Sequence, residues 1–148
     1  MRRRLRWRRR WMGAKHGPAL SVAVFRSPGG RGIEWAGPGP STRLDEWART
    51  SGFTASRDRE GLALVDAHVA AWRADAEVEA SLANEVGLYL GAVLVAQVPG
   101  ARWHVWPNGH PVLRMRDGRD VDVTDVVARR LDGSISSLTA VLDHHRST

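Results

Sequence analysis

The feature that most constrains this chain is an apolar segment, Ser81–Val98, that runs directly into two closely spaced turn signals. Its apolar residues recur at the spacing of one broad helical face: Leu82, Val86, Tyr89, Leu90, Val93 and Leu94. Ser81 is a suitable N-cap, while Gly87 and Gly91 stand one turn apart and open a groove for another backbone. The branched residues within Leu88–Val95 also fit a buried strand, and that alternative stays open.

The first turn signal predicts a β-hairpin. The sequence Trp-Pro-Asn-Gly-His at 106–110 has Pro where a type I turn favours it and Gly where a left-handed residue follows. The resulting three-residue loop pairs Trp106 with His110, His104 with Val112, and Trp103 with Leu113. We assign one face of this hairpin to the core: Trp103, Val105, Leu113 and Met115. The outer face then carries His104, Trp106, His110 and Val112, flanked by Arg114.

The second turn lies at Asp117 and Gly118. A two-residue loop is the usual interpretation of Asp-Gly, but it would place Asp120 and Asp122 beside the core residues. Since a slip of one residue reverses every side chain, we prefer a three-residue loop at Asp117–Arg119. That register brings Val121 and Val123 to the core face, and it pairs Arg116 with Asp120 and Arg114 with Asp122.

These elements predict one α+β domain, with N-terminal helices, a three-stranded antiparallel meander at about 102–123, and two C-terminal helices around one core. Before the meander we expect a helix over Leu44–Thr50, capped by Ser41 or Thr42 with Trp47 inward, and another over Gly61–Asp75. The second buries Leu62, Val65, Val69 and Trp72. After the meander, Thr124 caps a helix over Asp125–Leu131 that stops at Gly133, and a last helix spans about Ile135–His144.

Positive charge is concentrated at the N-terminus. Residues 1–16 contain Lys15 and seven arginines: Arg2, Arg3, Arg4, Arg6, Arg8, Arg9 and Arg10. They supply eight positive charges to a chain of net charge +6, so residues 17–148 carry about −2. We therefore predict a disordered basic arm at 1–16. Residues 17–40 are rich in Gly and Pro and predict a linker with a short strand at Ala19–Phe25. The domain occupies 41–148.

Composition excludes several classes of protein. The chain has no cysteine, so disulfides, thiol nucleophiles and cysteine-bound metals are excluded. No stretch approaches the roughly 18 apolar residues of a membrane span, and no apolar signal region follows the arm. We expect a soluble cytoplasmic protein. Phosphate-binding loops and the Gly-x-Ser-x-Gly motif are absent, so we expect neither cofactor nor metal.

The outer hairpin face supplies the function that we favour. An exposed tryptophan beside two histidines is typical of a contact surface. We predict a non-catalytic interaction module in which Trp106 anchors another protein and His104, His110 and Arg114 make polar contacts. The competing explanation is that a helix of this chain covers the same face.

Two alternative functions stay open. Glu85 and Tyr89 lie one turn apart, and with His104 they could perform acid–base chemistry in a small enzyme. Alternatively, the arginines of the arm could neutralise the phosphates of nucleic acid or of an anionic membrane. Adjacent His144 and His145 diverge by about 100° on a helix and indicate a cationic helix end instead of a metal site. The sequence fixes no oligomeric state.

Two strings in the chain carry a resemblance to a known family. They are Gly-Leu-Tyr-Leu-Gly at 87–91 and Trp-His-Val-Trp-Pro-Asn-Gly at 103–109, preceded by Pro99 and Gly100. Together they resemble an uncharacterised actinomycete-type bacterial family of unknown function, over roughly Gly61–Leu142. The resemblance implies a small cytoplasmic protein with no assigned reaction, and no catalytic residue is carried over. The helix and tryptophan-bearing meander are also similar, more loosely, to bacterial immunity-protein domains.

Overall fold

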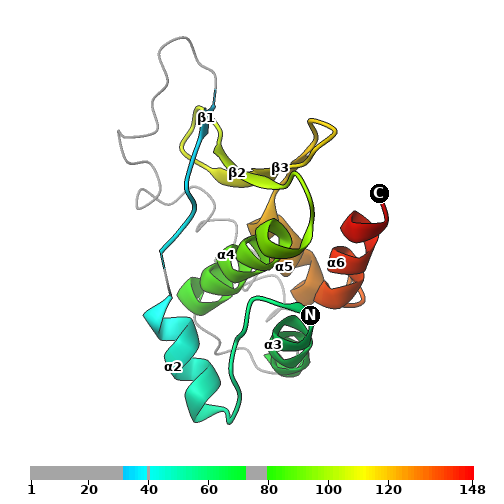
Figure 1. The fold of residues 1–148 in the computed structure, drawn as a ribbon. Coiled ribbons are helices and arrows are strands. Elements are labelled where there is room, and N and C mark those ends of the chain that lie inside the picture. Colours follow the sequence, from blue (N-terminus) through cyan, green and yellow to red (C-terminus); the bar gives the residue numbers. More distant parts are fainter. Residues whose placement is uncertain (1–31, 40, 73–79) are drawn as a thin grey trace.

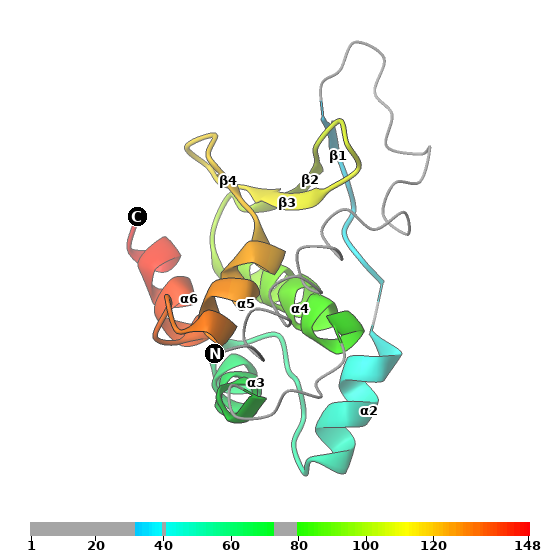
Figure 2. The same cartoon turned by 180° about the vertical axis from the view of Figure 1, so that it is seen from behind.

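The computed structural model describes residues 32–39, 41–72 and 80–148. The elements in these ranges are β1 (Ile33–Glu34), α2 (Thr42–Thr50), α3 (Arg59–Trp72), α4 (Ala80–Gln97), β2 (Arg102–Val105), β3 (Pro111–Arg114), β4 (Asp120–Val121), α5 (Val123–Asp132) and α6 (Leu138–Ser147). The strands form one antiparallel sheet in the order β1-β2-β3-β4. The helices lie on one side of this sheet (Figures 1 and 2). The predicted α+β class is confirmed.

The sheet has one strand more than the predicted meander. Ile33 pairs with Val105 and Glu34 with His104, so β1 lies at the edge beside β2. This strand falls inside the stretch that we predicted as a linker. The strand predicted at Ala19–Phe25 and the arm at 1–16 lie outside the described residues.

Residues 80–97 form a helix, so the alternative of a buried strand is wrong. Its core residues are fully or almost fully buried: Ala83, Val86, Tyr89, Leu90, Val93 and Leu94. Because α4 already includes Ala80, Ser81 is not its N-cap. The helix is central to the domain, since it packs against the sheet, α2, α3, α5 and α6.

The two glycines of α4 permit the close approach that their spacing predicts. A Cβ atom at Gly87 would lie 3.1 Å from the Thr124 Cα, so the start of α5 packs against this position. At Gly91, a Cβ atom would lie 2.2 Å from Cη2 of Trp103. The Trp103 indole also lies against Gly37, whose φ is +97°, and makes an edge contact with Trp35. Trp103 therefore fastens the inner face of the sheet to α4.

The first hairpin has the predicted register. Trp103 pairs with Leu113 and His104 with Val112, while the backbone N–H of Trp106 donates to the carbonyl of His110. Gly109 adopts a φ of +85°, as a left-handed residue after the turn requires. The loop therefore has three residues, and the assignment of the two faces is confirmed.

The register predicted for the second hairpin is wrong. Its loop also has three residues, but they are Arg116–Gly118, because the N–H of Met115 donates to the carbonyl of Arg119. This placement gives Gly118 the left-handed position, with a φ of +87°. Each pairing moves by two residues, so every side chain keeps its predicted face while its partner changes. Arg114 pairs with Asp120 and Leu113 with Val121; the predicted pairs Arg116–Asp120 and Arg114–Asp122 do not form.

The N-terminal helices follow the predicted pattern. Ser41 caps α2, since its hydroxyl accepts a hydrogen bond from the N–H of Leu44, and Trp47 packs partly buried against the core. Three of the predicted core residues of α3 are fully buried: Leu62, Val65 and Val69. The side chain of Trp72 and residues 73–75 lie outside the described part of the chain.

The caps of the C-terminal helices differ from those predicted. Asp122, not Thr124, caps α5, because its carboxylate accepts the N–H of Asp125 and the hydroxyl of Thr124. Gly133 ends α5 with a φ of +86°, as predicted. α6 begins at Leu138, three residues later than expected, after a cap by Ser137.

A buried ion pair joins three helices. Asp66 is only 9% exposed, although it was not among the residues that we predicted to be buried. Its carboxylate accepts a hydrogen bond from Nε of Arg130 at 2.8 Å and from the N–H of Leu138 at 2.9 Å. Asp66 therefore links α3 to α5 and to the first turn of α6. Among the described residues, no helix is long and apolar enough to cross a membrane.

The contact at Gly91 leads to a test of the fold. Alanine in a helix interior is ordinarily more favourable than glycine by about 1 kcal/mol. In Gly91→Ala the added methyl group would overlap the Trp103 ring, so we expect the free energy of unfolding to fall by about 1–3 kcal/mol, measured by guanidinium denaturation. Gly39→Ala is the control, because a Cβ atom there meets nothing within 4 Å. Equal effects of the two substitutions would contradict this account.

Candidate functional site

The site under consideration is the sheet face that points away from α4, here called the outer face. Alternation along the strands and the observed registers place seven side chains on it or at its end: His104, Trp106, His110, Val112, Arg114, Asp120 and Asp122. The helices lie on the opposite side of the sheet (Figures 1 and 2). Among the described elements, no helix covers the outer face.

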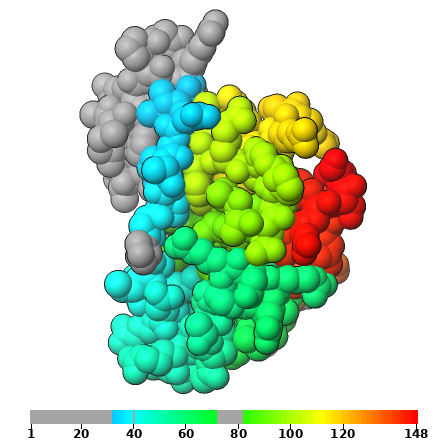
Figure 3. All heavy atoms as spheres, viewed as in Figure 1, coloured from blue at the N-terminus to red at the C-terminus, as the bar shows by residue number. Residues whose placement is uncertain are grey.

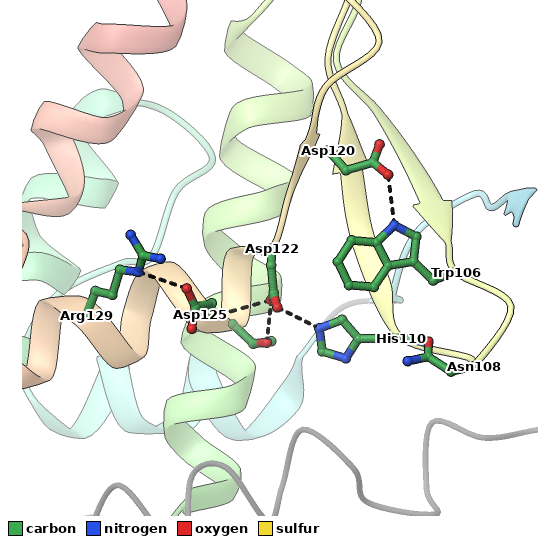
Figure 4. A network of polar contacts seen from close by, with 8 residues as sticks. Trp106, Asn108, His110, Asp120, Asp122, Asp125 and Arg129 are labelled. Atoms are coloured by element: carbon green, nitrogen blue, oxygen red, sulfur yellow. Dashed lines mark hydrogen bonds and ion pairs between the residues drawn. The ribbon is translucent and has the colours of Figure 1, made fainter.

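Trp106 covers much of this face itself. It follows β2 directly, and its indole N–H donates to the Asp120 carboxylate on β4 at 2.8 Å (Figure 4). Because β3 lies between β2 and β4, the ring crosses the outer face of β3, where Val112 is completely buried. The indole also packs against the ring of His110, with centroids 5.6 Å apart. Trp106 remains partly exposed.

Two side chains donate hydrogen bonds to the carboxylate of Asp120. Its carboxylate accepts hydrogen bonds from both Nε and Nη2 of Arg114, at 2.9 and 3.1 Å, in addition to the Trp106 N–H. The hydrogen bond from Arg114, against a smaller opposing effect of burial, lowers the pKa of Asp120, and the Trp106 N–H lowers it further. Asp120 therefore stays ionised near neutral pH and holds both the indole and the guanidinium in place.

His110 connects the hairpin loop to the start of α5. Its Nε2 lies 3.1 Å from Oδ2 of Asp122 (Figure 4). The distance is that of an ion pair, and Nε2 makes no hydrogen bond with the described residues. Burial alone would raise the pKa of Asp122. The contact with His110 and the bond from Thr124 outweigh it and lower that pKa to about 2.

His104 is enclosed at the other side of the face. It is 6% exposed, and a Cβ atom built on Gly32 would lie 2.3 Å from its Nε2. Burial, followed by the positive charge of Arg114, lowers the pKa of His104. This imidazole is therefore neutral at physiological pH.

The structure brings together all four residues that we predicted as a binding surface, but it does not expose them equally. His104 and His110 are 6% and 7% exposed, so they offer little surface for the polar contacts that we predicted. Trp106 is partly exposed, and the side chain of Arg114 is 31% exposed. The solvent-facing part of the site is thus Trp106 with Arg114, supported from below by buried histidines.

Sequence reasoning missed the contacts that two carboxylates make at this site. The prediction placed Asp120 and Asp122 on the outer face correctly, but it gave them the wrong partners because the second loop was displaced. The first hairpin provides the signal that would have corrected the register. In both loops Gly is the third residue, and the second residue, Asn108 or Asp117, accepts a hydrogen bond through its side chain from the backbone N–H two positions later.

The three residues of the enzyme alternative do not converge. Glu85 accepts a hydrogen bond from the hydroxyl of Ser41 at 2.8 Å. Tyr89 donates its hydroxyl proton to the carbonyl of Ser56, and burial raises the pKa of this phenol. Both side chains thus fasten the segment around α2 to α4, whereas His104 lies on the far face of the sheet. The geometry offers no shared substrate position.

No metal-binding group occurs in the described ranges, since no cluster of three or more suitable His, Asp or Glu side chains is found there. The arginines of the predicted arm, Arg2–Arg10, lie outside the described residues.

Comparison with protein families identifies what the chain is related to. A model described as a family of unknown function, DUF6278, matches residues 41–143. The chain belongs to this family. Searches of curated proteins and of solved structures found no match.

The DUF6278 range contains most of the elements described above. It runs from the cap of α2 into α6 and includes the Gly91–Trp103 contact and the whole Trp106 network, whereas β1 precedes it. The resemblance to a family of unknown function, stated from the strings at 87–91 and 103–109, is confirmed. Those strings form one structural unit, because the first is the part of α4 on which the second packs.

The lowered pKa of Asp122 leads to a prediction about acid stability. A carboxylate with a depressed pKa stabilises the fold above its ordinary value of 3.8, and this contribution is lost as pH falls toward 2. Asp122→Asn keeps a capping oxygen but removes the charge. Near pH 6 we expect the free energy of unfolding of the variant to be about 2 kcal/mol lower than that of wild type. This difference should disappear as the pH falls from about 4 to about 2. Denaturation across this pH range measures it; a difference independent of pH would contradict the assignment.

Proposed function

We propose that this protein is a non-catalytic interaction module that binds another protein through the outer face of the sheet, with Trp106 as the anchor. The observation that carries the proposal is the state of Trp106: the indole is partly exposed although both its N–H and its ring are held in place. A fixed and accessible indole favours a recognition role, because it offers a large apolar area at an exposed position and tryptophan is enriched among the residues that dominate binding energies.

Preorganisation supports this proposal energetically. Binding ordinarily costs about 0.5–1.5 kcal/mol for each flexible side chain that becomes ordered. Here Asp120 fixes the indole N–H, and the same carboxylate fixes the guanidinium of Arg114. Trp106 and Arg114 therefore reach the partner already ordered, and tryptophan and arginine are the residue types that most often dominate interface energies.

The surroundings of Trp106 also fit a contact surface. The loop residues Pro107 and Asn108 beside it are exposed, as is Arg102 on the same face, whose side chain is 53% accessible and pairs with Glu34. An apolar centre surrounded by exposed polar groups is the usual anatomy of a protein interface. The buried His104 and His110 then act as support for the surface instead of as contacts.

The test uses a photoreactive benzoylphenylalanine introduced into the full chain in lysate of the native cells. Placed at Arg102 on the outer face, it should cross-link to a partner; placed at Arg49, an exposed position on α2, it should not. Adding Trp106→Ala should reduce the Arg102 cross-link at least tenfold, because the anchor is lost. Leu64→Ala, which removes an exposed apolar side chain from α3, should leave it unchanged.

Circular dichroism and thermal unfolding establish that each variant is folded. Trp106→Phe provides a second variant, since it keeps an aromatic ring but cannot donate to Asp120. We expect it to retain a weakened cross-link. Equal cross-linking by wild type and a folded Trp106→Ala protein, or the same partner captured from Arg49, would overturn the proposal.

A further inference from the structure

A second surface lies at the end of the molecule where the loop between β3 and β4 approaches the C-terminal end of α6. Figure 3 shows these two segments on the same side of the molecule. The electrostatics confirm the proximity, because Arg119 and Asp117 of the loop both influence the pKa of His145 on α6. The stem of Arg116 lies against Gly100, where a Cβ atom would be 2.9 Å from the arginine Cβ.

This end of the molecule carries an excess of arginine, and we call it the basic patch. Its cationic side chains come from α3, from α6 and from the loop between β3 and β4: Arg59, Arg116, Arg119, Arg146, His144 and His145. Two of these arginines are paired with carboxylates: Asp117 pairs with Arg119 at 2.6 Å, and Asp143 pairs with Arg59 at 2.8 Å. The four arginines and the two aspartates paired with them sum to a charge of about +2 before any histidine is protonated.

The basic patch is exposed to solvent, and not all of its arginines form ion pairs with carboxylates of the described residues. Arg116, Arg146 and His144 are exposed, and the side chain of Arg119 is 70% exposed despite its pair. Within the described residues, Arg116 makes no ion pair. Burial, together with the neighbouring His144 and Arg119, lowers the pKa of His145, as expected where the local potential is positive.

We propose that the basic patch binds the phosphate backbone of a nucleic acid. Guanidinium groups match phosphate oxygens in a bidentate geometry. Contacts of this kind give affinity without reading base sequence, and their strength depends on salt because counterions are released. The rest of the domain is not basic, so the binding is local to this end. The proposal is independent of the surface around Trp106.

Nucleic acid fits this patch better than a membrane does. Peripheral membrane binding combines positive charge with apolar side chains that enter the lipid. Among the described residues, the exposed large apolar side chains are Leu64 and Val95, at 40% and 37%, on α3 and α4. Neither belongs to the basic patch. The arm at residues 2–10 is the other concentration of arginine in the chain, and the test must separate the two.

The experiment measures binding of the full chain to a fluorescein-labelled RNA oligonucleotide and to a labelled DNA duplex by anisotropy, between 50 and 200 mM salt. The patch variant is Arg116→Gln, Arg119→Gln and Arg146→Gln, since glutamine keeps the stem of each side chain. The control variant removes the same charge elsewhere, at Arg43→Gln, Arg49→Gln and Arg129→Gln, all exposed. A third variant replaces the seven arginines of residues 2–10 with serine.

We expect the patch variant to bind at least tenfold more weakly, with a slope of log K against log salt shallower by about 2–3, since each lost phosphate contact contributes about 0.9. The control variant should stay within about threefold of wild type. Absence of binding by wild type, equal loss in the patch and control variants, or loss only in the arm variant would overturn the proposal. Patch-dependent binding to phosphatidylserine vesicles without binding to either oligonucleotide would also overturn it, in favour of a membrane.

Discussion

The contact between Gly91 and Trp103 sets how closely the sheet approaches α4, and the arrangement of the domain depends on that distance. An indole ring fits there only because position 91 has no side chain. Gly87, one turn earlier, allows the start of α5 to pack on the same helix. Two small residues on one helix therefore determine where both the sheet and the C-terminal helices lie. The buried pair of Asp66 and Arg130 then joins α5 and α6 to α3.

The outer face follows from this inner contact. Once Trp103 and Leu113 face α4, alternation along the strands sends His104, Val112 and Arg114 to the opposite side. No described helix lies on that side. The side chain of Trp106 itself lies over β3, because its indole N–H donates to Asp120 on β4. The result is a face whose polar groups are paired but whose central aromatic ring still meets solvent.

Local chemistry explains what the sequence predicts well. The first hairpin was predictable in register because Pro107 and Gly109 together admit few turn types. The glycine groove of α4 was predictable because a spacing of four residues places both glycines on one side of a helix. The register of the second hairpin was not predictable in the same way, because the predicted register was chosen to place Val123 on the core face of the strand. That residue is buried, but as the first residue of α5 instead of as part of a strand.

Long-range partners explain what the sequence does not predict. Asp66 is a buried charge only because Arg130, 64 residues later, reaches it. Strand β1 has two residues and no alternating pattern, so only its pairing with β2 defines it. At the candidate site, the strand pattern placed His104 and Trp106 on the same face, but it could not show that His104 and His110 are enclosed. His110 packs against the Trp106 ring and His104 lies against Gly32, and local spacing predicts neither contact.

Asp120 holds the indole of Trp106 across the outer face, and the proposed surface depends on this contact. Hydrogen exchange of the indole N–H signals, followed by NMR in ¹⁵N-tryptophan-labelled protein and assigned with Trp106→Phe, tests this most directly. We expect the Trp106 N–H to exchange at least tenfold more slowly in wild type than in Asp120→Ala, while the Trp103 signal is unaffected. Equal exchange of the Trp106 N–H in both proteins would show that the indole is not held by Asp120, and the proposed preorganised surface would lose its basis.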